Sequence, residues 1–242
     1  MDYLSLTGQE KADTINRYLK EDYPVVRSPL FHRNAFEFLI AVMLSPQTND
    51  ETTNLVTPVL FERYSSPEAL AAADPEEVLN IIRRINYNKT KTARIIQAAR
   101  MLLERFDGKV PASMDDMLKL PGVGRKVANV ILNDWYATPA SENPPYEGES
   151  EPDRYNALPR GSVTPSGFVV DTHVNRVTRA LLLTDASAPE KIEQDMMRLL
   201  PKSDWMGTSL RMVFHGREVF QAKNPLFHEY PKWDVIYSQL GY

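Results

Sequence analysis

Cysteine is absent from this 242-residue chain. Its absence excludes disulfide bonds, thiol-based catalysis and any zinc or iron–sulfur site held by thiolates. Histidine is also scarce, and its four positions lack the close spacing of a metal-binding pair: His32, His173, His215 and His228. We therefore expect no structural metal.

Long apolar runs are missing as well. No stretch approaches the roughly 18 residues that a membrane-spanning helix needs, and the first residues, Met1-Asp-Tyr-Leu-Ser5, do not have the charged and apolar regions of a secretory leader. These absences predict a cytoplasmic protein without a membrane partner, associated with the nucleoid if the source is bacterial.

Positive charge is not in excess, because 28 Lys and Arg residues face 32 Asp and Glu residues, for a formal net charge of −4. Much of this charge lies in residues 138–168, where five acidic residues accompany two arginines. A nearly neutral chain can still have a basic face, since phosphate binding depends on where lysine and arginine lie. Composition permits nucleic-acid binding without favouring it.

Helical patterns are abundant and alternating β-type runs are few, so the sequence predicts an all-α fold. Ser66-Pro67 and Asp74-Pro75 are each typical of an N-cap followed by proline at the first helical position. Ser113 and Asp116 have the spacing of a capping box. Residues 92–106 have apolar side chains at helical spacing.

One segment interrupts this pattern. Residues 137–166 contain six prolines, several acidic residues and little apolar periodicity. This composition predicts an insertion that is an extended surface loop or is disordered, without a catalytic part.

The segment Leu120-Pro-Gly-Val-Gly-Arg-Lys126 has the composition of a helix-hairpin-helix. Two glycines allow backbone amides to approach a phosphate closely, and the second helix begins with a basic pair. An ordinary helix–helix turn with a solvated Arg125-Lys126 pair fits the same residues. Lys126 has two interpretations of its own: a nucleophile, which must be neutral and which burial near the helix start would favour, or a charged phosphate contact.

A second motif, Val170-Asp-Thr-His-Val-Asn-Arg-Val177, places a carboxylate at a helix start. Asp171 is a good N-cap residue. Capping and chemistry are compatible, because one carboxylate oxygen can cap while the other faces a ligand.

Three stretches, in the order in which the chain has them, closely resemble the endonuclease III family of helix-hairpin-helix DNA glycosylases with lyase activity. They are residues 120–133, residues 170–177 and the apolar run that precedes Ser45-Pro-Gln-Thr48. The resemblance implies two helical lobes with a DNA-binding cleft between them. It places residues 30–136 in a six-helix domain with the hairpin, and residues 1–29 plus 167–242 in a second helical domain, with 137–166 as the insertion.

By this resemblance, Lys126 attacks C1′ of the damaged nucleotide, expels the base and forms a Schiff base that allows β-elimination. Asp171 stabilises the developing sugar cation or helps to move protons. The hairpin residues Gly122, Val123, Gly124 and Arg125 are the expected DNA contacts. The predicted partner is double-stranded DNA with damaged bases or abasic sites, bound by a monomer.

Such enzymes flip the damaged base out of the duplex and fill the gap with side chains. The resemblance implies Gln47 for one filler and the loop around Tyr87 for the second. The family's usual Gly-Leu-Tyr-Asn is altered here, with Asn86 and Tyr87 at the glycine and leucine positions. We hypothesise that the bulkier wedge changes the opposite-base preference, which Tyr87→Leu would test.

The C-terminal region departs further from the family. Many relatives follow His-Gly-Arg with cysteines spaced C-x6-C-x2-C-x5-C around a [4Fe-4S] cluster, but here the four positions contain Phe220, Phe227, Tyr230 and Ile236. We predict that the cluster is absent and no cofactor is used, and that these side chains, with Trp233, form a hydrophobic plug in its place.

The predicted function is a bifunctional glycosylase and abasic-site lyase acting on oxidised pyrimidines. Two alternatives stay open on the sequence: a relative that acts on another lesion or mismatch, and a DNA-damage binding protein without turnover.

Overall fold

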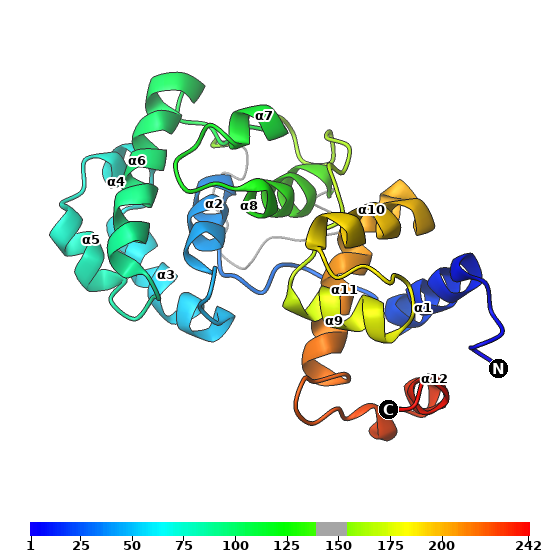
Figure 1. Cartoon of the computed structure of the whole chain (residues 1–242). Coiled ribbons are helices and arrows are strands. Elements are labelled where there is room, and N and C mark those ends of the chain that lie inside the picture. The colour runs from blue at the N-terminus through cyan, green and yellow to red at the C-terminus, as the bar shows by residue number, and fades with distance from the viewer. Residues whose placement is uncertain (139–153) are drawn as a thin grey trace. The chain divides into compact units, whose positions relative to one another are not determined.

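The computed structural model describes residues 1–138 and 154–242, and within these ranges the chain is helical without a β-strand (Figure 1). This confirms the predicted all-α class. The fold has two units: unit 1 contains Met1–Arg27 and Gly167–Tyr242, and unit 2 contains Ser28–Ser166. No helix in the described ranges is long and apolar enough to cross a membrane.

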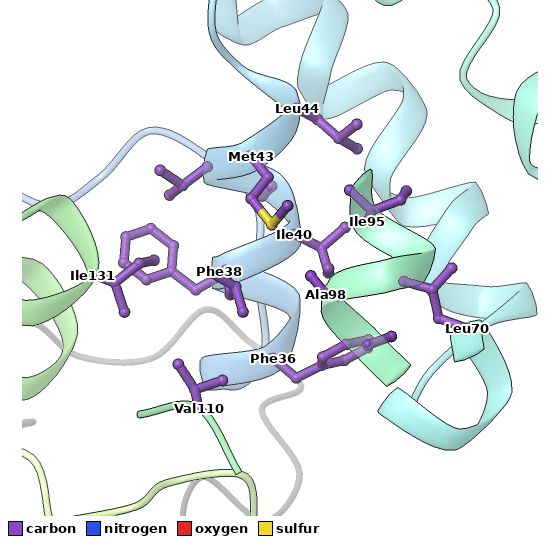
Figure 2. Packing of buried hydrophobic residues seen from close by; sticks show 14 of the residues in the cluster. Phe36, Phe38, Ile40, Met43, Leu44, Leu70, Ile95, Ala98, Val110 and Ile131 are labelled. Atoms are coloured by element: carbon purple, nitrogen blue, oxygen red, sulfur yellow. The ribbon is translucent and has the colours of Figure 1, made fainter. Parts of the chain in front are cut away.

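Helix α2 (Ala35–Leu44) is the centre of unit 2, because all ten of its residues are buried. Figure 2 shows Ile40 and Leu44 of α2 beside Ile95 of α6 (Asn88–Phe106), while Ile131 lies near Phe38. Nine of these residues are apolar, and the tenth, Glu37, pairs with Arg33 at 2.6 Å. A helix with so little polar surface is stable only when neighbours surround it. Helix α2 therefore fixes the positions of the segments that follow it and of those that pack on it.

Shorter helices complete unit 2, and their starts follow the sequence. Ser66 and Asp74 cap α4 and α5 as predicted. Ser113 caps α7, but the Asp116 carboxylate accepts a 2.8 Å hydrogen bond from the Ser113 hydroxyl rather than from its backbone N–H. Because aspartate is one methylene shorter than the glutamate of a usual capping box, its carboxylate bonds the Ser113 hydroxyl and not the Ser113 N–H. The bounds are α3 (Asp50–Arg63), α4 (Pro67–Ala71), α5 (Pro75–Ile81), α7 (Met114–Met117) and α8 (Arg125–Val130).

Helix α8 continues directly into a π-helical segment, η1 (Ile131–Ala137). Its Trp135 and Tyr136 are buried in the core of unit 2. The π-helical winding ends in Thr138, whose hydroxyl donates to the Asn133 carbonyl at 2.9 Å.

Residues 154–166 of the predicted insertion over 137–166 form an irregular loop whose residues are mostly exposed or half-buried, but this loop is attached to unit 2. Residues 139–153 lie outside the described residues. Tyr155 is part of the hydrophobic core. The Val110 N–H donates to the Tyr155 carbonyl at 2.8 Å.

Trp135 and Tyr136 explain this attachment. The indole N–H of Trp135 donates to Asn156 Oδ1 at 2.6 Å, and the guanidinium of Arg160 lies 4.3 Å from the centre of the indole ring. The carbonyl of Tyr136 accepts from Gly161 N at 2.8 Å. A buried indole needs an acceptor, and this segment supplies it. Polar composition hid the attachment because so few of its side chains are apolar.

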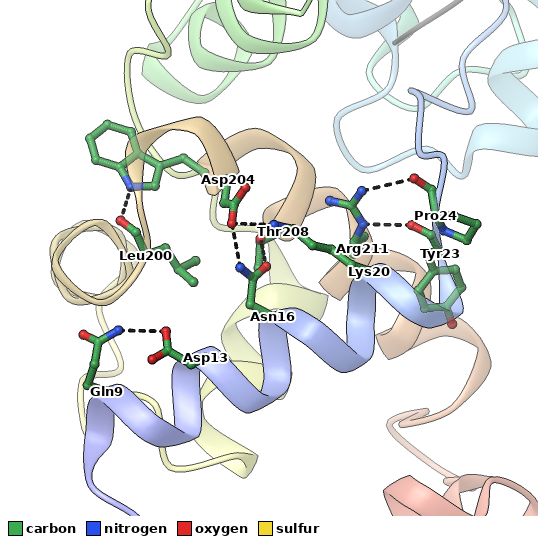
Figure 3. Close-up of polar contacts among 11 residues, drawn as sticks. Gln9, Asp13, Asn16, Lys20, Tyr23, Pro24, Leu200, Asp204, Thr208 and Arg211 are labelled. Atoms are coloured by element: carbon green, nitrogen blue, oxygen red, sulfur yellow. Dashed lines mark hydrogen bonds and ion pairs between the residues drawn. The ribbon is translucent and has the colours of Figure 1, made fainter.

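In unit 1, the N-terminal helix α1 (Gly8–Asp22) packs on α11 (Trp205–Glu218). Asn16 joins the two, since its amide donates to Asp204 at 2.7 Å and its Oδ1 accepts from the Thr208 hydroxyl at 2.6 Å (Figure 3). The other elements are α9 (Thr172–Ala180), α10 (Pro189–Leu199), η2 (Lys202–Asp204), η3 (Phe227–Glu229) and α12 (Pro231–Gln239).

Candidate functional site

The hairpin turn between α7 and α8 depends on one glycine for packing. Gly122 has a φ of 84°, and a Cβ at this position would lie 2.8 Å from Cδ of Arg94 on α6. The turn closes with a 3.1 Å hydrogen bond from Val123 N to the Leu120 carbonyl. Gly122 thus lets the backbone lie directly on α6, in a conformation that other residues rarely adopt.

The second glycine opens the hairpin to solvent. Gly124 is the N-cap of α8 and has no atom within 4 Å of a Cβ built on it. Among residues 1–138 and 154–242, no side chain forms a capping hydrogen bond at this helix start, and a helix N-terminus favours an anion. Val123 is buried, so its side chain belongs to the core and only its backbone faces the turn. Arg125 is exposed.

Lys126 is the second residue of α8 and is exposed. Burial, which would favour its neutral form, is therefore not what the structure provides at this position. Instead, the amine of Lys126 is accessible to solvent. It lies one residue beyond the hairpin, at a helix N-terminus, which favours a phosphate. A reagent or a nucleotide can reach this amine.

Asp171 is the N-cap of α9, in unit 1. Its Oδ1 accepts from His173 N and from Val174 N, both at 2.8 Å. Oδ2 has no hydrogen-bond partner among residues 1–138 and 154–242, and the residue is half-buried. The carboxylate is thus held in place through one oxygen, and capping by this oxygen is compatible with a chemical role for the other.

The structure brings Gln47 and Tyr87 into one assembly. We call residues 45–49 the Gln47 loop and residues 85–88 the Tyr87 loop. Both residues have a φ of 58°, in the left-handed region, and both side chains are exposed, Tyr87 to 66%. The Asn86 side-chain amide donates to the Gln47 carbonyl, and Asn86 N donates to Thr48 Oγ1 at 3.2 Å.

Sequence reasoning missed several basic residues near these loops. Arg83 and Arg84 directly precede the Tyr87 loop and are exposed, and within the described ranges their side chains have no partner. Arg94 lies against Gly122. Lys91 is a different case, because it is buried. Arginines beside a candidate DNA contact are visible in the sequence, but the burial of Lys91 is not.

Of the four positions at which many relatives have cluster cysteines, three are buried in a hydrophobic cluster and one is exposed. Phe220 stacks on Tyr237 with ring centres 4.3 Å apart and planes 3° from parallel, and Phe227 and Ile236 are buried beside them. Tyr230 is 37% exposed, so its expected place in the hydrophobic plug is wrong. It is the N-cap of α12 and immediately precedes Pro231.

His215 belongs to the same cluster. A 2.8 Å hydrogen bond joins its Nε2 to the Tyr237 hydroxyl, and its ring lies 4.1 Å from that of Trp233. Its Nδ1 is buried without a partner in the described residues. Burial lowers the pKa of His215 to about 3, so the ring is neutral at physiological pH.

Comparison with known proteins agrees with this architecture. Residues 40–202 match the HhH-GPD superfamily of base excision DNA repair proteins. The chain is 36% identical to "Endonuclease III" of Synechocystis sp., over 91% of this chain and 89% of that protein.

Two solved structures are similar over nearly the whole chain. One, "Structure of a Trapped Endonuclease III-DNA Covalent Intermediate: Estranged-Adenine Complex", has a TM-score of 0.77 and 33% identity, with 93% of each chain covered. The other, "Structure of a non-covalent Endonuclease III-DNA Complex", has a TM-score of 0.79 and 31% identity, with 98% of this chain and 97% of that chain covered. Within the HhH-GPD superfamily, this chain belongs to the endonuclease III family.

Proposed function

We propose that Lys126 is the nucleophile of this enzyme and that Asp171 assists it. The family defines the enzyme class, a DNA glycosylase and abasic-site lyase of base excision repair that acts on double-stranded DNA. Lys126 Nζ, once it has lost a proton, attacks C1′ of the damaged nucleotide, and the bond from C1′ to the base breaks. The base departs with the bonding electrons and takes up a proton. The nitrogen then loses a proton and its lone pair breaks the C1′–O4′ bond, so that O4′ becomes a hydroxyl and C1′ is joined to Lys126 as a Schiff base, which allows β-elimination of the 3′ phosphate.

The observation that carries this proposal is the position of Lys126. It is exposed, and it follows a hairpin whose second helix begins at a glycine with open space around it, a helix N-terminus suited to a phosphate. A backbone phosphate held there brings the sugar of the same strand within reach of the amine. Asp171 supplies a carboxylate oxygen without a partner in the described residues, which can stabilise positive charge on the sugar or accept a proton.

The hairpin and the two loops have separate roles in this proposal. The backbone of Gly122, Val123, Gly124 and Arg125 contacts phosphate, and Gln47 and Tyr87 fill the space that the flipped nucleotide leaves. Phosphate contacts position the protein and do not select the base. We propose oxidised pyrimidines as the preferred substrates.

We further propose that the protein works without an iron–sulfur cluster. A [4Fe-4S] cluster needs thiolate ligands, and the chain contains no cysteine. Phe220, Phe227 and Ile236 are packed in the core of unit 1, so these side chains do not fit a cluster. Aromatic burial holds this region instead.

Borohydride trapping tests the nucleophile directly, since it reduces a Schiff base to a stable protein–DNA adduct. The substrates are duplexes that contain thymine glycol, uracil or an abasic site. We expect an adduct with the unmodified protein that is lost in Lys126→Gln and kept in Lys109→Gln, a control at another exposed lysine of unit 2. The relative yields rank the lesions.

Each contrary result has a separate meaning. An adduct that persists in Lys126→Gln shows that another amine attacks the sugar. Binding to damaged DNA without an adduct indicates a damage-binding protein or a monofunctional glycosylase. A preference for uracil over thymine glycol excludes the proposed oxidised-pyrimidine specificity.

A further inference from the structure

Lys91, in the first turn of α6, is 7% exposed. Its Nζ donates to the carbonyls of Leu44 and Pro46, both at 2.7 Å, and approaches Thr48 Oγ1 at 3.5 Å. No carboxylate pairs with it within residues 1–138 and 154–242. The ammonium group is thus buried on two backbone carbonyls, with the Thr48 hydroxyl farther away.

Burying the Lys91 ammonium costs desolvation free energy, so its presence here needs an explanation. Burial lowers the pKa of Lys91 to about 8, because desolvation disfavours its charged form. A methionine would fill a similar volume without that cost. The difference between the two side chains is the set of N–H donors, so the donors are what this position uses.

The acceptors lie where α2 ends and the Gln47 loop begins. Leu44 is the last residue of α2, and the carbonyls at a helix C-terminus have no partner in the helix and carry partial negative charge. Pro46 directly precedes Gln47, whose left-handed backbone is uncommon for a residue other than glycine. Lys91 therefore binds the loop at the residue next to its strained position.

The Tyr87 loop is bonded to the same loop and shares one acceptor with Lys91, the Thr48 hydroxyl. Thr48 Oγ1 accepts from Asn86 N and faces Lys91 Nζ, and the Asn86 amide donates to the Gln47 carbonyl. Lys91 itself lies four residues after Tyr87, and its N–H donates to the Tyr87 carbonyl at 3.0 Å. One lysine is therefore bonded to both loops, by its backbone to one and by its side chain to the other.

We propose that Lys91 is a positioning residue that holds the Gln47 and Tyr87 loops in a single arrangement, so that the two exposed side chains enter the duplex together. This inference rests on the proposed function, in which Gln47 and Tyr87 fill the gap left by a flipped nucleotide. Lys91 touches no substrate; it fixes the spacing of the residues that do.

The test is Lys91→Met, with Lys89→Met as the matched control. Lys89 is on the same helix and exposed, so the control also removes one positive charge from α6. Dissociation constants are measured for an undamaged duplex and for one with a tetrahydrofuran abasic-site analogue. We expect Lys91→Met to reduce the preference for the abasic duplex by about tenfold or more and Lys89→Met to change it by less than about twofold.

A second background separates positioning from a general structural role. In Gln47→Ala/Tyr87→Ala, the side chains that Lys91 positions are gone, so adding Lys91→Met should change the preference by less than about twofold. An equal loss in both backgrounds would show that Lys91 acts elsewhere and would overturn the proposal.

If circular dichroism shows that Lys91→Met does not fold, Asn86→Ala/Thr48→Val provides the same test at the surface of the assembly. We expect this variant to reduce the abasic preference by about threefold or more, since it removes hydrogen bonds between the loops. An unchanged preference in a folded variant overturns this inference alone. A wild-type protein that shows no abasic preference overturns the proposed function with it.

Discussion

Two glycines flank Val123 in the hairpin, and packing requires only the first. At Gly122 a methyl group would meet the Arg94 side chain, and the backbone is left-handed. At Gly124 the φ of −96° and ψ of 175° are ordinary for any residue, and the space is open. We expect Gly122→Ala to lower the free energy of unfolding by about 1–3 kcal/mol.

Gly124→Ala is the matched control, and its effect should appear in binding rather than in folding. Urea unfolding should show a change below about 0.5 kcal/mol, while a methyl group at the helix start weakens the approach of a phosphate to the N–H groups. If the two alanine variants are equally stable, the close approach to Arg94 does not determine the role of Gly122.

His215 makes stability depend on pH. Its pKa is about 3 in the folded protein and 6.5 in the unfolded chain, so between these values the unfolded chain binds more protons. Its contribution to stability is therefore complete above pH 6.5 and is lost as the pH falls toward 3. Between pH 7 and pH 5 we expect the free energy of unfolding to fall by about 2 kcal/mol on account of this histidine.

The measurement is urea unfolding of the wild type and His215→Gln at pH 8, 7 and 5. The fall from pH 7 to pH 5 should be smaller in the variant, and the two proteins should respond alike between pH 8 and pH 7. An equal fall in both would mean that other groups cause the loss.

At the scale of single elements, the segment 154–166 is held by Asn156. Its Oδ1 accepts from the buried indole N–H of Trp135. Asn156→Ala leaves that donor without its partner, and we expect a loss of about 1–3 kcal/mol in the free energy of unfolding. Leu158→Ala, at an exposed side chain of the same segment, should cost less than about 0.5 kcal/mol. Equal costs would show that the segment is loosely attached.

Among the four C-terminal positions 220, 227, 230 and 236, the exposed Tyr230 provides a control for substitution of the buried Phe227. Phe227→Ala removes a fully buried ring, and we expect it to lower the free energy of unfolding by about 3–5 kcal/mol. Tyr230→Ala, at the exposed member of the four positions, should cost less than about 0.5 kcal/mol. Thermal unfolding of the wild type should not change with an iron chelator. A loss of stability on chelation would contradict aromatic burial as the substitute for a cluster.

These elements show which parts a sequence reveals. Ser66 and Asp74 cap the helices they were expected to cap, because capping is decided within a few residues. The burial of Lys91 and the attachment of Tyr155 depend on residues far along the chain, so no local pattern marks them. Lys126 and Asp171 are candidates from sequence motifs, and the sequence alone does not show that Lys126 is exposed.

At the scale of the whole molecule, net charge does not determine DNA binding. The chain is negative overall, yet Arg83 and Arg84 provide local positive charge next to the Tyr87 loop. We expect Arg83→Gln/Arg84→Gln to weaken binding to all duplexes and to reduce the slope of log K against log salt by about 1 for each phosphate that the protein no longer neutralises. Titration over a range of salt concentrations measures the slope. An unchanged slope would exclude these arginines from the interface.

Unit 1 is built from both ends of the described chain, and this arrangement affects the order in which the protein is made. The Tyr3 hydroxyl donates to the Leu181 carbonyl at 2.6 Å, and Tyr3 N donates to Gln239 at 2.7 Å. On the ribosome, residues 1–27 emerge before unit 2 but cannot complete their own unit until residues 167–242 follow. Unit 2 has all its residues available earlier, and domains fold as units during synthesis. The apolar face of α1 therefore stays exposed to chaperones and proteases while unit 2 folds, until residues 167–242 are synthesised.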